Sequence, residues 1–254
     1  MKHTFLFFQF VIIAFCAQAQ IDSLNTANNK LLTQNLKTGT NTYLIYFQDS
    51  LNGPKYNFSI WERSLSKKEL SGNQVYQLDW KRFTSDKAST IEYEIILEAK
   101  TFTPISEKVA GEVQKPEKQF VKKHFIYNEN KMYTNTDTSK HNQPEVKIED
   151  LQHSFNWEAD LETFSILPLA KDKSFAICFY HPGSSTPPTY YLYKIVGSEN
   201  VTFNNQEISC WVLEIDYGSH NSKAKFWIDK STHQVLKTQD IFPGGYRFKT
   251  LLSN

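Results

Sequence analysis

The sequence has three cysteines and no surplus of charge of either sign, and both features limit what the protein can be. Lys and Arg together number 28, and Asp and Glu together number 27, so the net charge is +1. Proteins that bind nucleic acid or an anionic membrane surface usually carry a clear basic surplus. The balance therefore argues against both kinds of partner, and we expect no nucleic-acid ligand.

The common catalytic and cofactor motifs are also missing from the sequence. It has no Gly-rich phosphate loop and no G-x-S-x-G nucleophile turn. No pair of histidines beyond residue 19 has the spacing of a helical or hairpin zinc site. These histidines are His124, His141, His153, His181, His220 and His233. We therefore predict a protein that is not an enzyme, with no catalytic residue, no metal and no cofactor.

An apolar run occurs at the N-terminus, but it is shorter than a membrane-spanning helix requires. Lys2 and His3 precede the run from Phe5 to Phe15, and Ala17-Gln18-Ala19 follows as a small-x-small cleavage site. This pattern predicts a secretory signal peptide over residues 1–19, cleaved after Ala19, and a periplasmic or secreted protein. Lipidation at Cys16 is less favoured, because a lipid-attachment signal has a small residue where Phe15 stands.

Two cysteines remain after this cleavage, Cys178 and Cys210, and each lies inside an apolar run. In an oxidising compartment they could form a disulfide. The alternative is two buried thiols on strands. The sequence leaves both open.

Residues 20–254 read as a mainly β protein without a second apolar segment. Aromatic residues make up 15% of the chain, against nine Gly and nine Pro. β-Branched and aromatic residues cluster in short runs between turn residues, which predicts strands joined as antiparallel hairpins. The predicted runs are 42–47, 56–65, 75–84, 90–102, 119–128, 132–135, 175–180, 190–203, 208–218 and 224–238.

The runs of residues 42–110 and 175–240 match at a constant separation of 133 positions. Ile60 then falls on Tyr193, Val75 on Ile208, and Trp80 on Leu213. This pattern indicates two pseudo-repeats within one domain. The alternative is that any two β-meanders look alike.

Two segments have helical patterns. In residues 156–169, Asn156 can cap a helix whose face carries Trp157, Leu161 and Phe164, and Pro168 ends it. A second helix is predicted over residues 21–36.

The polar stretch FWIDKSTHQVLKTQ, residues 226–239, has the side chains of an active site but the pattern of a hairpin. Asp229 and Ser231 are turn formers, and four polar residues on one turn do not converge easily. The carboxylate pairs Glu92/Glu94 and Glu214/Asp216 alternate with apolar residues, so we place them on the solvent face of strands.

WIDKSTHQVLK, with VGSENVTFNNQEISCWVLEIDYG and FSILPLAKDKSFAICFYHPG upstream, resembles exported proteins related to the LolA/LolB lipoprotein-carrier superfamily, including uncharacterised members from Bacteroidota. The resemblance covers most of residues 43–252 and is specific from about residue 155 onward. It implies a single large antiparallel sheet curled as a half-barrel over residues 20–254, with one or two helices on its concave face. In the carriers that face is apolar and holds an acyl chain.

We therefore predict an exported non-enzymatic protein that binds an apolar ligand, such as a lipid, an acyl chain or a lipidated protein. The predicted pocket lining is Trp157, Leu161, Phe164, Phe179, Trp211 and Trp227. The alternatives are a structural or interaction protein of the cell envelope whose own side chains fill the cavity, and a hydrolase with an unrecognised site. The sequence predicts no oligomeric state.

Overall fold

The computed structural model describes residues 21–84, 90–114, 118–135, 146–218 and 222–253. Sixteen strands form one sheet in this part of the chain. They are β1 (Ile21–Leu24), β2 (Gly39–Gln48), β3 (Tyr56–Leu70), β4 (Asn73–Thr84), β5 (Thr90–Glu98), β6 (Pro104–Gln114), β7 (Lys118–Asn128), β8 (Lys131–Thr134), β9 (Lys147–Ile148), β10 (Phe155–Asn156), β11 (Ser174–Tyr180), β12 (Thr189–Phe203), β13 (Gln206–Asp216), β14 (Lys223–Asp229), β15 (Val235–Phe242) and β16 (Gly245–Ser253).

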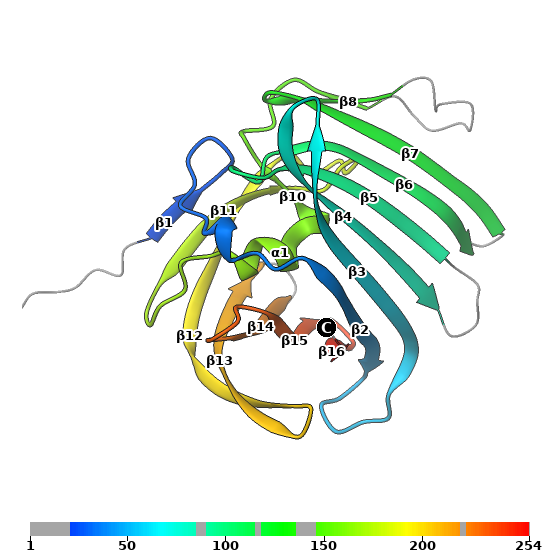
Figure 1. The fold of residues 1–254 in the computed structure, drawn as a ribbon. Coiled ribbons are helices and arrows are strands. Elements are labelled where there is room, and N and C mark those ends of the chain that lie inside the picture. The colour runs from blue at the N-terminus through cyan, green and yellow to red at the C-terminus, as the bar shows by residue number, and fades with distance from the viewer. Residues whose placement is uncertain (1–20, 85–89, 115–117, 136–145, 219–221, 254) are drawn as a thin grey trace, which may run out of the picture.

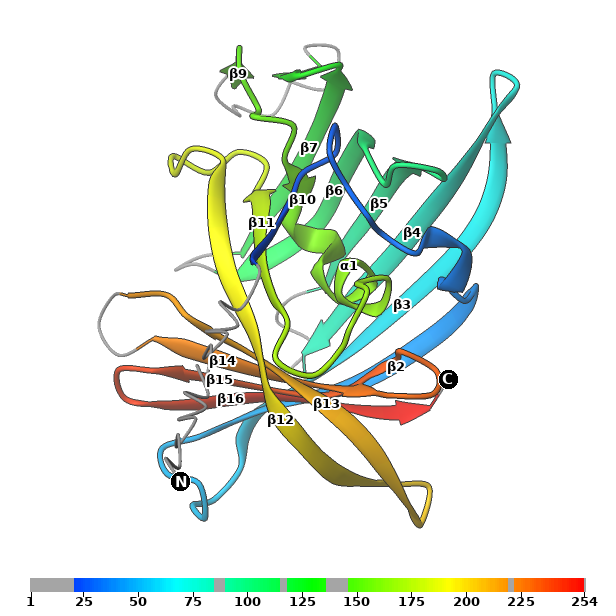
Figure 2. The same ribbon diagram turned by 90° about the vertical axis from the view of Figure 1, so that its left-hand side faces the viewer.

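The sheet is curled but does not close. Its order is β1-β11-β12-β13-β14-β15-β16-β2-β3-β4-β5-β6-β7-β8-β9, with β10 beside β11, so β1 and β9 end it. The long strands are all antiparallel, and the short strands β1 and β10 run parallel to β11. The curl surrounds a single short helix, α1 (Asp160–Ser165), on the concave side (Figures 1 and 2). The predicted fold class, mainly β with a curled sheet and a helix in its concavity, is confirmed.

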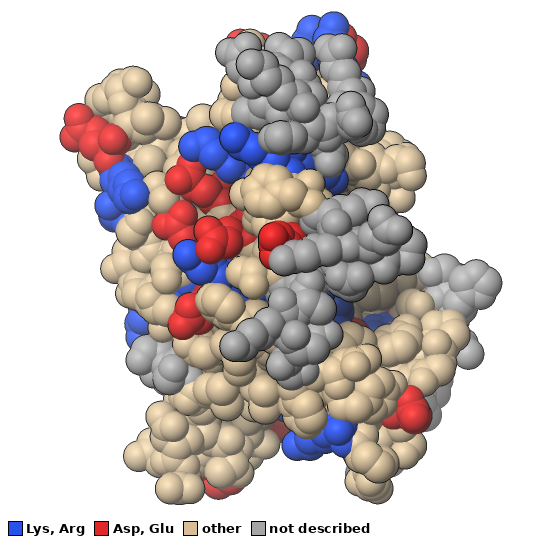
Figure 3. Space-filling view, turned by 90° about the vertical axis from the view of Figure 1, so that its right-hand side faces the viewer, with Lys and Arg blue, Asp and Glu red and all other residues tan. Residues whose placement is uncertain are grey.

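Strand alternation sends apolar side chains to the concave side and charged ones outward. Leu213 faces Phe226 across β13 and β14, and both are buried, whereas the next pair, Glu214 and Lys225, forms an outer ion pair at 3.3 Å. Glu92 likewise pairs with a lysine of the neighbouring strand, at 3.0 Å. The predicted solvent position of the carboxylate pairs is confirmed, and Figure 3 shows acidic and basic side chains interleaved on one face.

The helix prediction for residues 156–169 is right at its start and too long at its end. The Asn156 side chain accepts the Glu158 N–H at 2.8 Å, as a cap does, and a 3-10 turn (Trp157–Ala159) leads into α1. The helix stops at Ser165, before Pro168, because Ile166 and Leu167 turn into the core, where neither is exposed.

The predicted helix over residues 21–36 is wrong. Asp22 and Leu24 are buried and alternate with exposed residues, which is strand periodicity, and this segment pairs with β11. The chain then runs past α1, where the Leu32 N–H donates to the Ile166 carbonyl at 2.7 Å, and forms a 3-10 turn (Thr33–Asn35). Pairing along an available sheet edge overrides a weak helical pattern.

Several strands of the two predicted pseudo-repeats, which lie 133 positions apart, match in their bounds and pairings. β3 and β12 correspond residue for residue in their bounds, and β4 and β5 pair with the same register as β13 and β14. The correspondence stops after these strands, because β15 and β16 pair differently from β6 and β7. That the two halves arose as repeats stays a prediction.

The short strands β1, β9 and β10 were not predicted by the sequence pattern, and neither were two long ones, β6 and β16. β6 begins with Pro104 and contains Gly111, both unusual within strands. Gly111 has φ +150°, and a Cβ there would collide with the Thr90 carbonyl, so this close approach of strands requires glycine. β16 carries Arg247 and Lys249 at concave positions, which breaks the apolar alternation.

The stretch 226–239 is a hairpin, as predicted. β14 ends at Asp229, whose carboxylate accepts the Ser231 N–H at 2.8 Å and the Thr232 hydroxyl at 2.6 Å. These bonds stabilise the turn into β15.

Cys178 and Cys210 are buried, free thiols. They lie on β11 and β13, which are separated by β12, and their partners on β12 are Tyr190 and Glu199, nine residues apart. That separation far exceeds the ~7 Å limit for bridging two Cα atoms, so the possible disulfide is not formed.

Several predictions concern residues outside the described part of the chain. The signal peptide with its cleavage site falls there, as do His141 and His220. Within the described residues, no helix combines the length and apolar composition that a membrane crossing requires.

Candidate functional site

Three of the six predicted pocket residues fill the interior of the curl. Leu161, Phe164 and Phe179 are at most 2% exposed. The Phe164 ring lies 4.6 Å from that of Phe226 and 5.0 Å from that of Tyr193. These side chains pack α1 onto the sheet and leave little room among themselves.

The three predicted tryptophans lie in separate places. Trp157 is half-buried and lines a cleft of about 280 Å³ with Phe179 and Tyr191. Trp211 lines a different cleft, where the Lys230 ammonium lies 4.4 Å from its ring centre. Trp227 lies on the opposite face of β14 from Phe226, so it faces away from the concavity. The structure therefore does not gather the six residues around one cavity.

Beneath α1 the concave face carries charge, which the sequence analysis did not predict. Arg63 on β3 is 1% exposed and forms a bidentate ion pair with Glu162 of α1. The Arg63 Nη2 that contacts Glu162 also donates to the Glu158 carbonyl at 2.7 Å. Burial lowers the pKa of Arg63, but the Glu162 carboxylate more than offsets this, so the pKa is raised and Arg63 stays charged.

A second polar cluster lies at the start of α1. Glu107 on β6 is 1% exposed and accepts the Asn156 side-chain N–H at 2.6 Å. Burial, aided by the charge of Glu158, raises the pKa of Glu107 to about 8. Burial also raises the pKa of Glu158 to about 7, with a smaller contribution from Asp160.

Raised carboxyl pKa values can mark acid–base chemistry. Here, Glu107 and Glu158 line none of the five cavities described in this section, and Asn156 covers Glu107. We therefore treat the cluster as part of the interior that seats α1.

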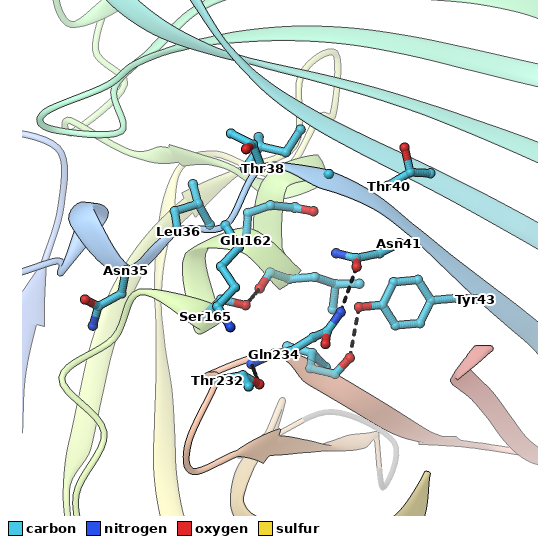
Figure 4. Close-up of a pocket in the computed structure, with 15 residues that line it drawn as sticks. Asn35, Leu36, Thr38, Thr40, Asn41, Tyr43, Glu162, Ser165, Thr232 and Gln234 are labelled. Atoms are coloured by element: carbon cyan, nitrogen blue, oxygen red, sulfur yellow. Dashed lines mark hydrogen bonds between the residues drawn. The ribbon is translucent and has the colours of Figure 1, made fainter. Parts of the chain in front are cut away.

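A small polar pocket of about 180 Å³ lies at the end of α1, between the chain leading into β2 and the turn after β14 (Figure 4). Its wall groups bind one another. Gln234 donates to Asn41 at 2.7 Å, Tyr43 donates to the Val235 carbonyl at 2.9 Å, and Glu162 is held by Arg63. This pocket is smaller than the usual small-molecule site, and several of its polar groups bind one another, so it is a weak candidate.

The strongest candidate is a pair of adjoining clefts on the concave side. The first, of about 310 Å³, is lined by Ile45, Phe47, Asn57, Phe58, Ser59, Trp61, Arg82, Thr84 and Arg247. The second, of about 400 Å³, is lined by Phe47, Tyr217, Ser222, Lys223, Asp240, Ile241, Phe242 and Arg247. Because they share Phe47 and Arg247, we call them together the Arg247 groove. Each alone reaches the size range of small-molecule sites, which starts at roughly 300 Å³.

The walls of the Arg247 groove are aromatic. The Phe47 ring contacts those of Phe242 and Tyr56, with centres 6.2 Å apart in both cases. Trp61 lies 5.0 Å from Trp80, on which Tyr93 stacks at 3.9 Å. These contacts hold the wall rings in place, so the groove is formed without a ligand.

The charged side chains of the groove are three cations, Arg82, Lys223 and Arg247, and one carboxylate, Asp240. Arg247 donates through Nε to Asp240 at 2.7 Å. Arg82 is half-buried and forms no ion pair or hydrogen bond with another described residue. The Trp61 indole N–H is buried without a hydrogen-bond partner in the same part of the chain. Among the described residues no cluster of His, Cys, Asp and Glu could hold a metal ion.

The sequence analysis missed the groove, although Trp61 and Arg82 stood within predicted strands. The available signal was the inward position of arginine: Arg63 follows Trp61 by two residues, and Arg82 follows Trp80 by two. An arginine in phase with buried aromatic residues on a strand indicates an inward charge. Which inward charges share one cleft depends on how strongly the sheet curls.

Comparison with known proteins identifies a family and a fold. A family model described as "Protein of unknown function (DUF3108)" matches residues 42–250, from β2 to β16. No curated protein matches the sequence. The crystal structure of a beta-barrel-like protein of a domain of unknown function, DUF1849, from Brucella abortus is similar, with a TM-score of 0.53 and 9% identity. The similarity covers 84% of this chain and 94% of that one, and at this identity it concerns the fold alone.

Proposed function

The chain belongs to the DUF3108 family of proteins of unknown function. We propose that it is a non-enzymatic protein that binds an apolar or amphiphilic ligand. The ligand lies in the Arg247 groove, with its apolar part against the aromatic walls. Suitable ligands are a lipid, an acyl chain or the lipid part of a lipidated protein.

The observation that carries this proposal is the preformed groove itself. Two clefts of about 310 and 400 Å³ adjoin at Phe47, and their walls include Trp61, Phe58 and Phe242. Apolar walls with a few oriented polar groups are the usual form of a small-molecule site. The resemblance of the sequence to LolA/LolB-like carriers remains our hypothesis about the ligand class.

A second candidate function is a structural or interaction protein of the cell envelope. It is favoured by the interior around Phe164, which the protein's own aromatic rings fill. This candidate needs no ligand in the groove, so a binding experiment separates the two.

We also propose that the protein is exported, on the basis of the signal-peptide pattern in residues 1–19. The intact mass of protein recovered from the periplasm or medium tests this. A mass that corresponds to a chain beginning at Gln20 supports export, and an uncleaved chain in the cytoplasm contradicts it.

Ligand binding is tested first on protein purified from its natural compartment without detergent. Native mass spectrometry should show an adduct of lipid mass that organic extraction removes, and the extracted protein should take up a fluorescent fatty acid. A bare mass together with no uptake would overturn the proposal and favour the structural function.

A matched pair of variants then locates the site. Ser59 lines the groove, whereas Ser66 lies on the same strand and faces the other side of the sheet. Ser59→Trp fills the cleft and should weaken binding of the fatty acid at least about tenfold, because the ligand loses apolar contact area. Ser66→Trp should leave binding unchanged, and equal effects of the two substitutions would place the ligand elsewhere.

A further inference from the structure

Arg82 is a cation of the Arg247 groove that has no ion-pair partner among the described residues. It lies on the concave side of β4, in the same inward row as Trp80, and directly opposite Trp61 on β3. The outward neighbour Lys81 pairs with Glu92 at 3.0 Å, but Arg82 has no such partner among the described residues. A half-buried guanidinium without an ion-pair partner loses part of its hydration, and nothing in the described structure offsets that loss. A bound anion would offset it.

Arg247 adds a second cation whose hydrogen-bonding capacity is only partly used. Its Nε binds Asp240, and its remaining N–H groups form no hydrogen bond with a described residue. Because a guanidinium has five N–H donors in a planar fork, the unused edge suits a carboxylate or a phosphate. Arg247 lines both clefts, so an anion on it would lie where they meet.

The other polar groups of the groove add no free charge. The Trp61 N–H is buried and has no hydrogen-bond partner among the described residues. Lys223 in the second cleft is already bound to Asp216 at 2.9 Å, and Asp240 is bound to Arg247. The charge left without a carboxylate partner among the described residues of the groove is therefore that of Arg82, beside aromatic side chains.

We propose that the ligand of the Arg247 groove is an anionic amphiphile, whose carboxylate or phosphate head binds Arg82 and Arg247 while its chain lies against Phe47 and Trp61. This inference rests on the proposed binding function and names its ligand class. A neutral lipid would leave the two guanidinium groups as they are and gain nothing from them.

The test compares ligands that differ in the head group alone. Titration calorimetry on the full mature chain measures binding of dodecanoate, dodecyl phosphate and dodecanol, with inorganic phosphate as a head without a chain. We expect dodecanoate and dodecyl phosphate to bind at least about tenfold more tightly than dodecanol, the size of effect that charged hydrogen bonds give. Inorganic phosphate should bind far more weakly than dodecyl phosphate.

The adjacent residues Arg82 and Lys81 provide matched variants. Arg82→Gln should remove most of the preference for the charged head and leave dodecanol binding unchanged, whereas Lys81→Gln should preserve the preference. Arg82→Lys keeps the charge but loses the planar fork, so it should retain part of the preference. It also provides a folded comparison if Arg82→Gln is unstable.

The outcomes separate this inference from the proposed function. Equal binding of dodecanoate and dodecanol, or a full preference in Arg82→Gln, would overturn the anionic head while leaving the binding function standing. Absence of binding by every chain-bearing ligand would overturn both. If inorganic phosphate bound as tightly as dodecyl phosphate, the site would be one for a free anion, and the proposal of an amphiphilic ligand would be overturned.

Discussion

At the scale of single residues, the concave face holds ionisable groups where the resemblance to lipid carriers implies an apolar surface. Arg63, Glu107 and Lys249 are each at most 5% exposed. Arg63 has a carboxylate partner, whereas Glu107 accepts a hydrogen bond from the Asn156 amide. Burial lowers the pKa of Lys249 and raises that of Glu107 to about 8, because both environments disfavour the charged form.

The raised pKa of Glu107 predicts how stability depends on pH. A carboxyl group with a higher pKa in the folded protein binds its proton more tightly there than in the unfolded chain. The contribution of Glu107 to the free energy of unfolding is therefore most favourable below pH 4.5, the ordinary pKa of the group. This contribution is lost as the pH rises through about 8. Glu158, with a pKa of about 7, acts in the same direction over an overlapping range.

Glu107→Gln removes this titration and keeps an oxygen that can accept from Asn156. We expect the variant to be more stable than wild type at pH 8.5, by about 1–4 kcal/mol, and to lose less stability between pH 5 and 8.5. Urea unfolding at a series of pH values measures both. Glu112→Gln, exposed on the same strand, should show the wild-type slope, and an unchanged slope in Glu107→Gln would contradict the buried charge.

At the scale of elements, α1 is held in the curl by a few specific contacts. Six residues are too few for a helix to be stable in water alone. Asn156 caps the 3-10 turn that leads into it, Phe164 anchors it in the core, and the Arg63–Glu162 pair ties it to β3. The helix is therefore a consequence of the sheet that surrounds it.

Breaking the pair on one side should be costly because it leaves a buried charge without a partner. Arg63→Met should lower the free energy of unfolding by about 3–5 kcal/mol. The double variant Arg63→Met/Glu162→Leu should recover much of that loss, since neither charge is then buried alone. Urea unfolding of the two single variants and the double variant gives the coupling, and purely additive losses would mean that the pair is not coupled.

The elements also show which sequence signals are reliable. The strand patterns from Tyr56 to Glu98 and from Thr189 to Asp229 were strong because apolar and polar residues alternate there. The pattern failed at β6 and β16, where Pro104, Gly111 and the inward Arg247 interrupt it. It also failed at β1, where pairing with β11 determined the structure. Strand pairing across distant segments is invisible to a local pattern.

At the scale of the whole molecule, the sheet remains open and its outer edges are short. β1 has four residues and β9 has two, which limits the unpaired backbone offered to another chain. The Arg247 groove lies across β16, β2, β3 and β4, in the middle of the strand order and away from both edges.

The arrangement of strands also predicts how the thiols behave. Burial raises the pKa of Cys178 and of Cys210 to about 11, and β12 keeps them apart. We expect a thiol reagent at pH 8 to modify both in denaturant and neither in the folded mature protein, and reductant to leave the melting temperature unchanged. A mass two units lower under non-reducing conditions, or a melting temperature lowered by reductant, would contradict this arrangement.

The sequence by itself determined most of the long strands, their alternation and the absence of a charge surplus, because these follow from local periodicity and composition. It also determined the cap at Asn156 and the turn at Asp229, which depend on neighbours in the chain. The tertiary structure decided which inward side chains meet. Ile45, Trp61, Arg82 and Arg247 share a cleft because β16, β2, β3 and β4 lie side by side, although β16 is almost 200 residues from β2. The curled sheet brings together what the chain keeps apart, because strands distant in the sequence pair within it.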